Sequence, residues 1–466
     1  MASFMTTREP TAPRFPLLVA IISIALTVFV VVGVLSGGPI MRTLVLTVGA
    51  MALGAYVATT HPLTIFRTFA AVLGFAPFIH VPGTSIPLLL VLAVGIWVAL
   101  VSVPGVELRP GWCEAWVALI VVIALLSVAA TDSSVGSFIE YAAWVAATAT
   151  VVPVRFLPAA ARISTVQVFV VGAAAASVAG MLLLVNSHGL VARALSFTGI
   201  DPDRPHVQVV AGSELVSTRL NGTYFEANIA GFVLAAALLL CLAVISGRAR
   251  VLLAVIIGTG LLLTLSRSAM ATVAVALILV ALRTGGRRRA RLVLAGIAGV
   301  VAAVAIPAVR SRLLDSFGPT DTGTAARLDA LNGFARRMHE HWVWGLGWDR
   351  PEFRDASSAF QANLVANTPL ATVYRGGVIL GLLIVVVMIL LVVRSWRFAR
   401  RGFREALIGC SIIAFLLVAL QLDYPVVTQP CATILVSMLV AMSMPGGVAS
   451  RGDPERLRAD SGPHHR

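Results

Sequence analysis

The sequence predicts an all-α integral membrane protein, a polytopic bundle of about 12 to 14 transmembrane helices with a partly helical extracytoplasmic loop. Hydrophobic residues make up 58% of the 466 positions. Charged residues make up only 12%, whereas soluble domains carry about a quarter. Apolar runs of roughly 17 to 25 residues, the length that crosses about 30 Å of hydrocarbon, recur from Pro16 to Met444. These runs are too uniformly apolar for the alternating strands of a membrane barrel.

The predicted spans follow one another along most of the chain. The first resembles a signal peptide in length, but it lacks a small-residue cleavage site and is interpreted as a retained helix. The spans are predicted at about residues 16–35, 40–58, 64–79, 86–104, 114–130, 135–154, 163–185, 224–246, 250–265, 268–283, 291–308, 374–394, 405–422 and 426–444.

The distribution of arginine predicts how these spans are oriented. All 35 basic residues are arginine, and the net charge is +14. Arginine clusters at 283–291 and 394–404 fill two short connections, which are therefore predicted to be cytoplasmic. Alternation from these clusters places both termini in the cytoplasm, together with Arg155, Arg162 and Arg248. It places two long connections, about residues 186–223 and 309–373, outside. Loops of that length in a compact bundle are usually functional or disordered.

The composition excludes several kinds of chemistry. Without lysine, the chain cannot be a Walker-type phosphate-loop protein, a Schiff-base enzyme or a pyridoxal enzyme. Arginines concentrated in short loops favour contact with membrane lipids over binding to nucleic acid. Cys113, Cys241, Cys410 and Cys431 lack metal-ligand spacing and are predicted to be packing residues. No metal site or cofactor is predicted.

The turn Ser266-Arg267 interrupts two spans with almost no connecting loop. In the predicted topology it lies at the outer membrane boundary. An arginine held there costs free energy unless an anion or a carboxylate partners it. The alternative is a helix-hairpin turn whose arginine snorkels toward water.

The second outer loop contains a predicted helix followed by a glycine-containing segment. Residues 325–341 have helical spacing, with Arg327 in the first turns and Asp329 beside it. Gly345 and Gly347 permit a tight backbone path close to a ligand. A surface loop with an aromatic anchor is the alternative interpretation.

Two further polar segments head predicted spans. Asn367 precedes a glycine-rich helix that contains Arg375, and Arg219 precedes a stretch with Glu226 and Asn228. Both segments place amides and an arginine at the outer mouth of the bundle. The alternative is that they are plain helix caps at the water boundary.

Together these four segments resemble the O-antigen ligase and O-antigen polymerase superfamily of membrane glycosyltransferases, over roughly residues 219–390. Such enzymes transfer a glycan from a polyprenyl-diphosphate carrier to an acceptor hydroxyl on the outer face of the bacterial plasma membrane. The resemblance implies that Arg267 and Arg327, with Arg219 beside them, bind the diphosphate through charge-assisted hydrogen bonds. It further implies that no cofactor is needed. Residues expected to position the substrate or the loops are Ser266, Asn228, Asn367, Gly345 and Gly347.

The chain departs from the family pattern at one important position. Ligases of the family carry histidine before the asparagine of the third segment, as the proposed base, and here that residue is Ala366. A positioned base contributes about 10²- to 10⁴-fold. Candidate replacements are His341, ranked first, then Glu226 and Asp329, with His339 and Glu340 also on the outer side. The change favours a polymerase-like or divergent member over a true ligase.

The resemblance divides the chain into four parts. Residues 1–218 hold the N-terminal spans and the first outer loop, and 219–394 form the ligase-like core with the large loop 309–373. Residues 395–446 hold the last spans, and 447–466 form a cytoplasmic tail predicted to be disordered. The expected partners are a polyprenyl-diphosphate-linked glycan, an acceptor glycan or lipid, and membrane lipids.

Two other functions stay open from the sequence. A lipid or glycan transporter would show an inverted repeat and broken helices near the membrane midplane, whereas the polar residues here gather at the outer rim. A non-catalytic scaffold is compatible with Ala366. Glu140, inside a span, is either functional or a buried structural residue.

Overall fold

The regular structure of the protein is α-helical, with one 3-10 turn and one two-stranded ribbon among the described residues, which confirms the predicted all-α fold. The computed structural model describes residues 49, 52–81, 86–103, 106, 110–131, 133–185, 190–196, 207–209, 218–224, 226–305, 310, 331–349, 367–420 and 430–445. The predicted span 16–35, most of 40–58 and the tail 447–466 lie outside these residues.

The N-terminal helices follow the apolar runs in order. Their bounds are α3 (Pro62–Phe75), α4 (Leu88–Ser102), α5 (Trp112–Thr131), α6 (Val135–Ala149), α7 (Val151–Phe156), α8 (Ala159–Val185) and α9 (Leu190–Ala194). The spans predicted at 64–79, 86–104, 114–130 and 163–185 therefore agree with α3, α4, α5 and α8 to within a few residues.

The span predicted at 135–154 is two helices, and proline explains the break. Helix α6 ends at Ala149, and α7 carries Pro153 as its third residue. Proline lacks an amide hydrogen, and its ring clashes with the carbonyl four residues earlier, which is that of Ala149. The two helices together still form a 22-residue apolar segment.

The C-terminal half begins with the ribbon that the sequence did not predict, β1 (Val207–Val209) paired antiparallel with β2 (Thr218–Leu220). The 3-10 turn η2 (Gly222–Tyr224) leads from it into the helices. These are α10 (Ala227–Val244), α11 (Gly247–Leu263), α12 (Arg267–Arg283), α13 (Gly286–Ala305), α16 (Thr368–Phe398), α17 (Phe403–Val418) and α18 (Pro430–Met442).

Length and composition make this a multi-pass membrane protein. Among the described residues, five apolar segments are long enough to cross a bilayer, namely Trp112–Thr131, Val135–Phe156, Ala159–Val185, Ala227–Val244 and Thr368–Phe398. Helices α3, α4 and α18 are shorter and equally apolar.

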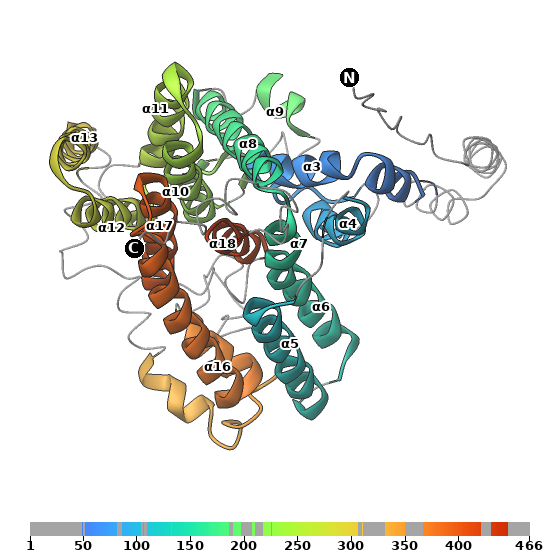
Figure 1. The fold of residues 1–466 in the computed structure, drawn as a ribbon. Coiled ribbons are helices and arrows are strands. Elements are labelled where there is room, and N and C mark those ends of the chain that lie inside the picture. Colours follow the sequence, from blue (N-terminus) through green and yellow to red (C-terminus); the bar gives the residue numbers. More distant parts are fainter. Residues whose placement is uncertain are drawn as a thin grey trace, which may run out of the picture.

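Helices α10 and α18 form the centre of the bundle. Almost every residue of α18 is buried, and Figure 1 shows it near the middle of the molecule, flanked by α17, α7 and α10. Helix α10 is rich in alanine, and small residues let neighbouring helix backbones approach closely. Helix α13 lies at the edge of the bundle beside α12.

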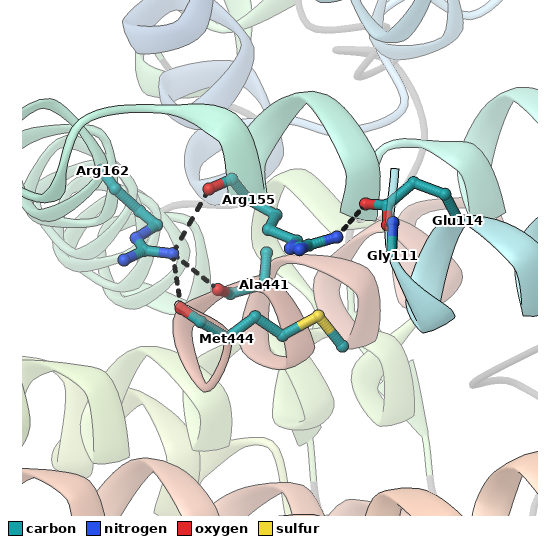
Figure 2. A network of polar contacts seen from close by, with 6 residues as sticks. All are labelled: Gly111, Glu114, Arg155, Arg162, Ala441 and Met444. Carbon is teal, nitrogen blue, oxygen red and sulfur yellow. Dashed lines mark hydrogen bonds and ion pairs between the residues drawn. The ribbon is translucent and has the colours of Figure 1, made fainter. Parts of the chain in front are cut away.

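A polar network joins four chain segments at one end of this bundle (Figure 2). Arg162, in the first turn of α8, donates to the carbonyls of Ala441 (3.0 Å) and Met444 (2.9 Å) at the end of α18, and more weakly to that of Arg155 (3.5 Å). Arg155 forms an ion pair with Glu114 of α5. These arginines, predicted to mark the cytoplasmic side, therefore also cap helix ends inside the protein.

Candidate functional site

The candidate residues of α12 and α16 lie at one end of the bundle. Helices α12 and α17 pack together, and Arg283 at the end of α12 lines the same cleft as Phe403 at the start of α17. The two helices are therefore antiparallel, so Ser266, just before α12, lies toward the end of α17. The amide of Thr368 donates to the carbonyl of Ala419 (2.9 Å), which places the start of α16 at the same end.

Helix α10 begins at this end as well. Phe232 near its start meets Phe415 near the end of α17 edge to face, with ring centroids 4.5 Å apart. The segments headed by Asn228, Ser266 and Asn367 thus share one end of the bundle. That this end faces the outside of the cell stays a prediction.

A chain of hydrogen bonds connects the ribbon, α10 and the α11–α12 turn. Arg219 of β2 donates from Nε to the carbonyl of Thr264 (3.0 Å) and from Nη2 to Oδ1 of Asn228 (2.8 Å). Asn228 donates in turn from Nδ2 to Oε1 of Glu226 (3.1 Å). Three predicted site residues, separated from the turn by about 40 positions, are therefore brought together around it.

The α11–α12 turn is tight and packed against α10. Leu265 has a positive φ of 52°, which is uncommon for a residue with a side chain. The amide of Ser266 donates to Oγ1 of Thr264 (3.2 Å), and Ser266 is only 1% exposed. A side chain at Gly231 of α10 would lie 2.7 Å from Cβ of Ser266, so the glycine permits this close approach.

This packing explains how Arg267 is presented. Arg267 is the first residue of α12 and is half-buried. Because Ser266 is enclosed beneath it, the turn is held against α10 and keeps Arg267 at this end of the bundle. The charge is therefore held at the boundary of the apolar bundle, where an anion stabilises it most.

The glycine-containing segment of the loop before α16 docks into a break in that helix. Gly377 has φ 80° and ψ 174°, which interrupts the helix after its first turns. The amide of Leu346 donates to the carbonyl of Tyr374 (2.7 Å), and the amide of Val378 donates to the carbonyl of Trp342 (2.7 Å). The loop thus forms hydrogen bonds with backbone groups near the break in α16.

Glycine is required on both sides of this junction. A Cβ at Gly377 would lie 1.8 Å from the carbonyl oxygen of Val343, and one at Gly345 would lie 2.6 Å from the carbonyl of Arg375. Gly347 donates its amide to that same carbonyl (3.3 Å). The tight backbone path expected at Gly345 and Gly347 is therefore made against α16, and a ligand close to it stays a prediction.

Asn367 caps α16 and ties it to α17. Its Oδ1 accepts from the amide of Leu370 (3.0 Å), and its Nδ2 donates to the carbonyl of Leu420 (2.8 Å). This is the helix-cap arrangement considered from the sequence. A role for Asn367 toward substrate stays a prediction.

The three candidate bases have different surroundings. Glu226 is partly buried and accepts the hydrogen bond from Asn228. His341 is exposed, as are His339 and Glu340, whose side chains lie 3.7 Å apart. Arg327 and Asp329 lie outside the described residues, so their predicted roles stay predictions.

The structure adds a pair of charged residues that the sequence did not join. Arg375 of α16 is 8% exposed, and its Nη1 lies 3.7 Å from Oε2 of Glu140 on α6. Its guanidinium lies over the ring of Trp348, 6.0 Å from the centroid. The sequence identifies each of Arg375 and Glu140 as a charged residue in an apolar segment. It does not predict that they pair, because the pairing depends on how α6 and α16 pack.

The described residues contain no group of three His, Cys, Asp or Glu side chains that could hold a metal ion. All four cysteines are buried, as their packing role predicts.

The family comparison matches the region that holds most of this site. Residues 251–372 match the family model described as O-antigen ligase. The matched region runs from α11 through the Ser266-Arg267 turn and the docked loop to the first turns of α16. No curated protein matches the chain.

Proposed function

We propose that this chain transfers or polymerises glycan from a polyprenyl-diphosphate carrier, and the match of residues 251–372 to the family model described as O-antigen ligase supports this proposal. The acceptor is a hydroxyl group of a glycan or lipid, and the reaction takes place at the outer face of the plasma membrane. The carrier diphosphate is the leaving group.

The observation that carries this proposal is the arrangement around the α11–α12 turn. Arg219 of β2 donates to the carbonyl of Thr264, three residues before Arg267, so it holds the turn that carries Arg267 at the end of an apolar bundle. A membrane-anchored diphosphate carries its negative charge at that depth. Guanidinium groups bind phosphate oxygens through paired hydrogen bonds, which suits them to stabilise a departing diphosphate.

In the proposed reaction the acceptor hydroxyl attacks the anomeric carbon of the donor with inversion. A bond forms between the acceptor oxygen and that carbon while the bond from the carbon to the diphosphate oxygen breaks. Arg267 and Arg327 neutralise the charge that develops on the diphosphate. We assign Glu226 as the base that receives the hydroxyl proton, because Asn228 links its carboxylate to Arg219.

The first prediction tests Arg267. Arg267→Ala in proteoliposomes supplied with polyprenyl-diphosphate glycan from the native host should slow transfer about 100-fold or more. Two lost hydrogen bonds to a charged group, at about 1.5 to 3 kcal/mol each, account for that factor. Arg248→Ala is the matched control, because Arg248 is an exposed arginine near the start of the preceding helix. Transfer at the wild-type rate by the Arg267→Ala variant would contradict the proposal.

One observation favours a transporter as the second candidate. Helix α16 is discontinuous at Gly377, and broken helices are typical of transporter sites. Against this, loop residues 342–347 supply partners for the backbone groups near the break. The same proteoliposomes separate the two candidates, because a transporter moves labelled lipid-linked glycan across the bilayer without forming a joined product.

A further inference from the structure

A basic cleft lies at the end of the bundle opposite the proposed transfer site. Its volume is about 430 Å³, and arginines 283, 287 and 400 line it together with Phe403 and Ala406. Arg267 begins α12 and Arg283 ends it, so 17 residues of helix separate the two ends by about 25 Å. The cleft is therefore independent of the chemistry at the Ser266-Arg267 turn.

Arg283 is held in an unusual state. Its guanidinium lies over the ring of Trp396 at 3.2 Å from the centroid, which fixes its position. Its Nε and Nη2 atoms are buried and have no hydrogen-bond partner among the described residues. Burying part of a guanidinium without hydrogen-bond acceptors costs free energy, which the Trp396 ring offsets only in part, so an anion in the cleft would stabilise this charge further.

The surroundings of Arg283 are strongly positive. Arg287 is the second residue of α13, and Arg400 lies in the turn after α16. Both are exposed and line the same cleft. Glu405 places one carboxylate on the first turn of α17, close to Gly402. Three arginines around one hollow attract an anion that carries more than one oxygen, for which a phosphate group is the best geometric match.

Apolar surface adjoins these charges. Ala399, Ala406 and Leu407 form a buried cluster against which Phe403 packs. Leu282 of α12 is 63% exposed, and Leu294 of α13 is 68% exposed. In a membrane protein, exposed leucines of this kind face the acyl chains of lipids. A ligand that joins a phosphate group to hydrocarbon fits this combination of a basic cleft and apolar flanks.

We propose that this cleft binds the phosphate headgroup of an anionic membrane lipid, with Arg283, Arg287 and Arg400 as its ligands and the acyl chains along α12 and α13. The arginine distribution predicts that this end is cytoplasmic, and the cytoplasmic leaflet is rich in anionic lipids. The lipid would hold the peripheral helix α13 and the α16–α17 turn against α12.

The test measures lipid retention by the full-length protein. Wild type is placed in phosphatidylcholine nanodiscs that contain increasing amounts of phosphatidylglycerol, and the anionic lipid retained is measured by native mass spectrometry. Arg283→Gln should weaken retention roughly tenfold, because it removes a charge-assisted contact. Arg400→Gln, at an exposed position, should weaken retention in the same direction and does not depend on the buried site tolerating substitution.

Controls distinguish specific lipid binding from binding of free phosphate and from nonspecific attraction of the lipid to any exposed arginine. Arg248→Gln removes an exposed arginine predicted to lie on the same side but outside the cleft, and it should retain lipid like wild type. Inorganic phosphate at millimolar concentration should not displace the lipid, and displacement would identify the cleft as a free-phosphate site and overturn the lipid assignment. Equal retention by wild type, Arg283→Gln and Arg400→Gln would also overturn it.

Discussion

At the scale of single residues, arginine serves three different purposes in this chain. Arg162 caps the end of α18 from within the protein, and Arg219 organises the turn before α12. Arg267 and Arg283 lie at opposite ends of α12, where the proposals assign each an anion. Counting arginines predicts topology, but only the contacts separate a structural guanidinium from one available to a ligand.

The structural role of Arg162 leads to a stability prediction. Arg162→Ala removes hydrogen bonds to two carbonyls at the end of α18, and hydrogen bonds to charged groups contribute about 1.5 to 3 kcal/mol each. We expect destabilisation of about 3 kcal/mol and a lower melting temperature in detergent. Arg248→Ala should melt like wild type, and an unchanged melting temperature for Arg162→Ala would contradict the assignment.

The identity of the base is tested by two isosteric variants. Glu226→Gln keeps an oxygen that can accept from Asn228 but cannot take a proton, so transfer should fall about 10²- to 10⁴-fold. His341→Gln should retain most of the activity, because His341 is exposed and outside the network around the turn. The reverse pattern would assign the base to His341.

At the scale of elements, apolar runs predicted the helices and missed the contacts between them. The span predicted at 268–283 is α12 at 267–283, because a continuous apolar run of that length favours a helix over a strand. The ribbon was not predicted because β1 and β2 have only three residues each and are not adjacent in the sequence. The link from Arg219 to Thr264 also depends on tertiary packing, which local spacing does not contain.

The break in α16 gives a prediction at this scale. Gly377→Ala places a methyl group 1.8 Å from the carbonyl of Val343 at a φ of 80°, so the loop must leave α16 or the helix must straighten. We expect destabilisation of about 3 kcal/mol and faster proteolysis within residues 341–347. Gly285→Ala is the matched control, because a Cβ there meets nothing within 4 Å. Equal proteolysis of the two variants would contradict the docking of the loop.

At the scale of the whole molecule, the antiparallel packing of α12 and α17 separates two charged regions to opposite ends of the bundle. The segments of Asn228, Ser266 and Asn367 share one end, and the basic cleft occupies the other. Alternation of spans and arginine counting predicted this separation from the sequence. Residues 311–330, which hold Arg327, lie outside the described part of the chain, so the convergence of Arg267 and Arg327 stays a prediction.

Cysteine labelling tests the orientation of the molecule. The native cysteines are buried, so a membrane-impermeant maleimide should give little background in intact cells. Glu340→Cys, where the side chain is 80% exposed, should label from outside. Arg248→Cys should label only after the membrane is permeabilised, and the opposite pattern would invert the proposed topology.

The junction between α16 and the loop that precedes it also determines which substitutions the protein tolerates. The hydrogen bonds that the loop makes there use its own backbone groups, paired with the backbone of α16 and with the hydroxyl of Ser127, so they do not depend on the side chains that the loop carries. Trp342, Val343 and Trp344 remain 37% to 50% exposed. A saturation library at these three positions, at Gly345 and at Gly377 should therefore accept broad diversity at the first three while rejecting nearly every replacement at the two glycines, so the exposed face of the loop can diversify without losing its anchorage.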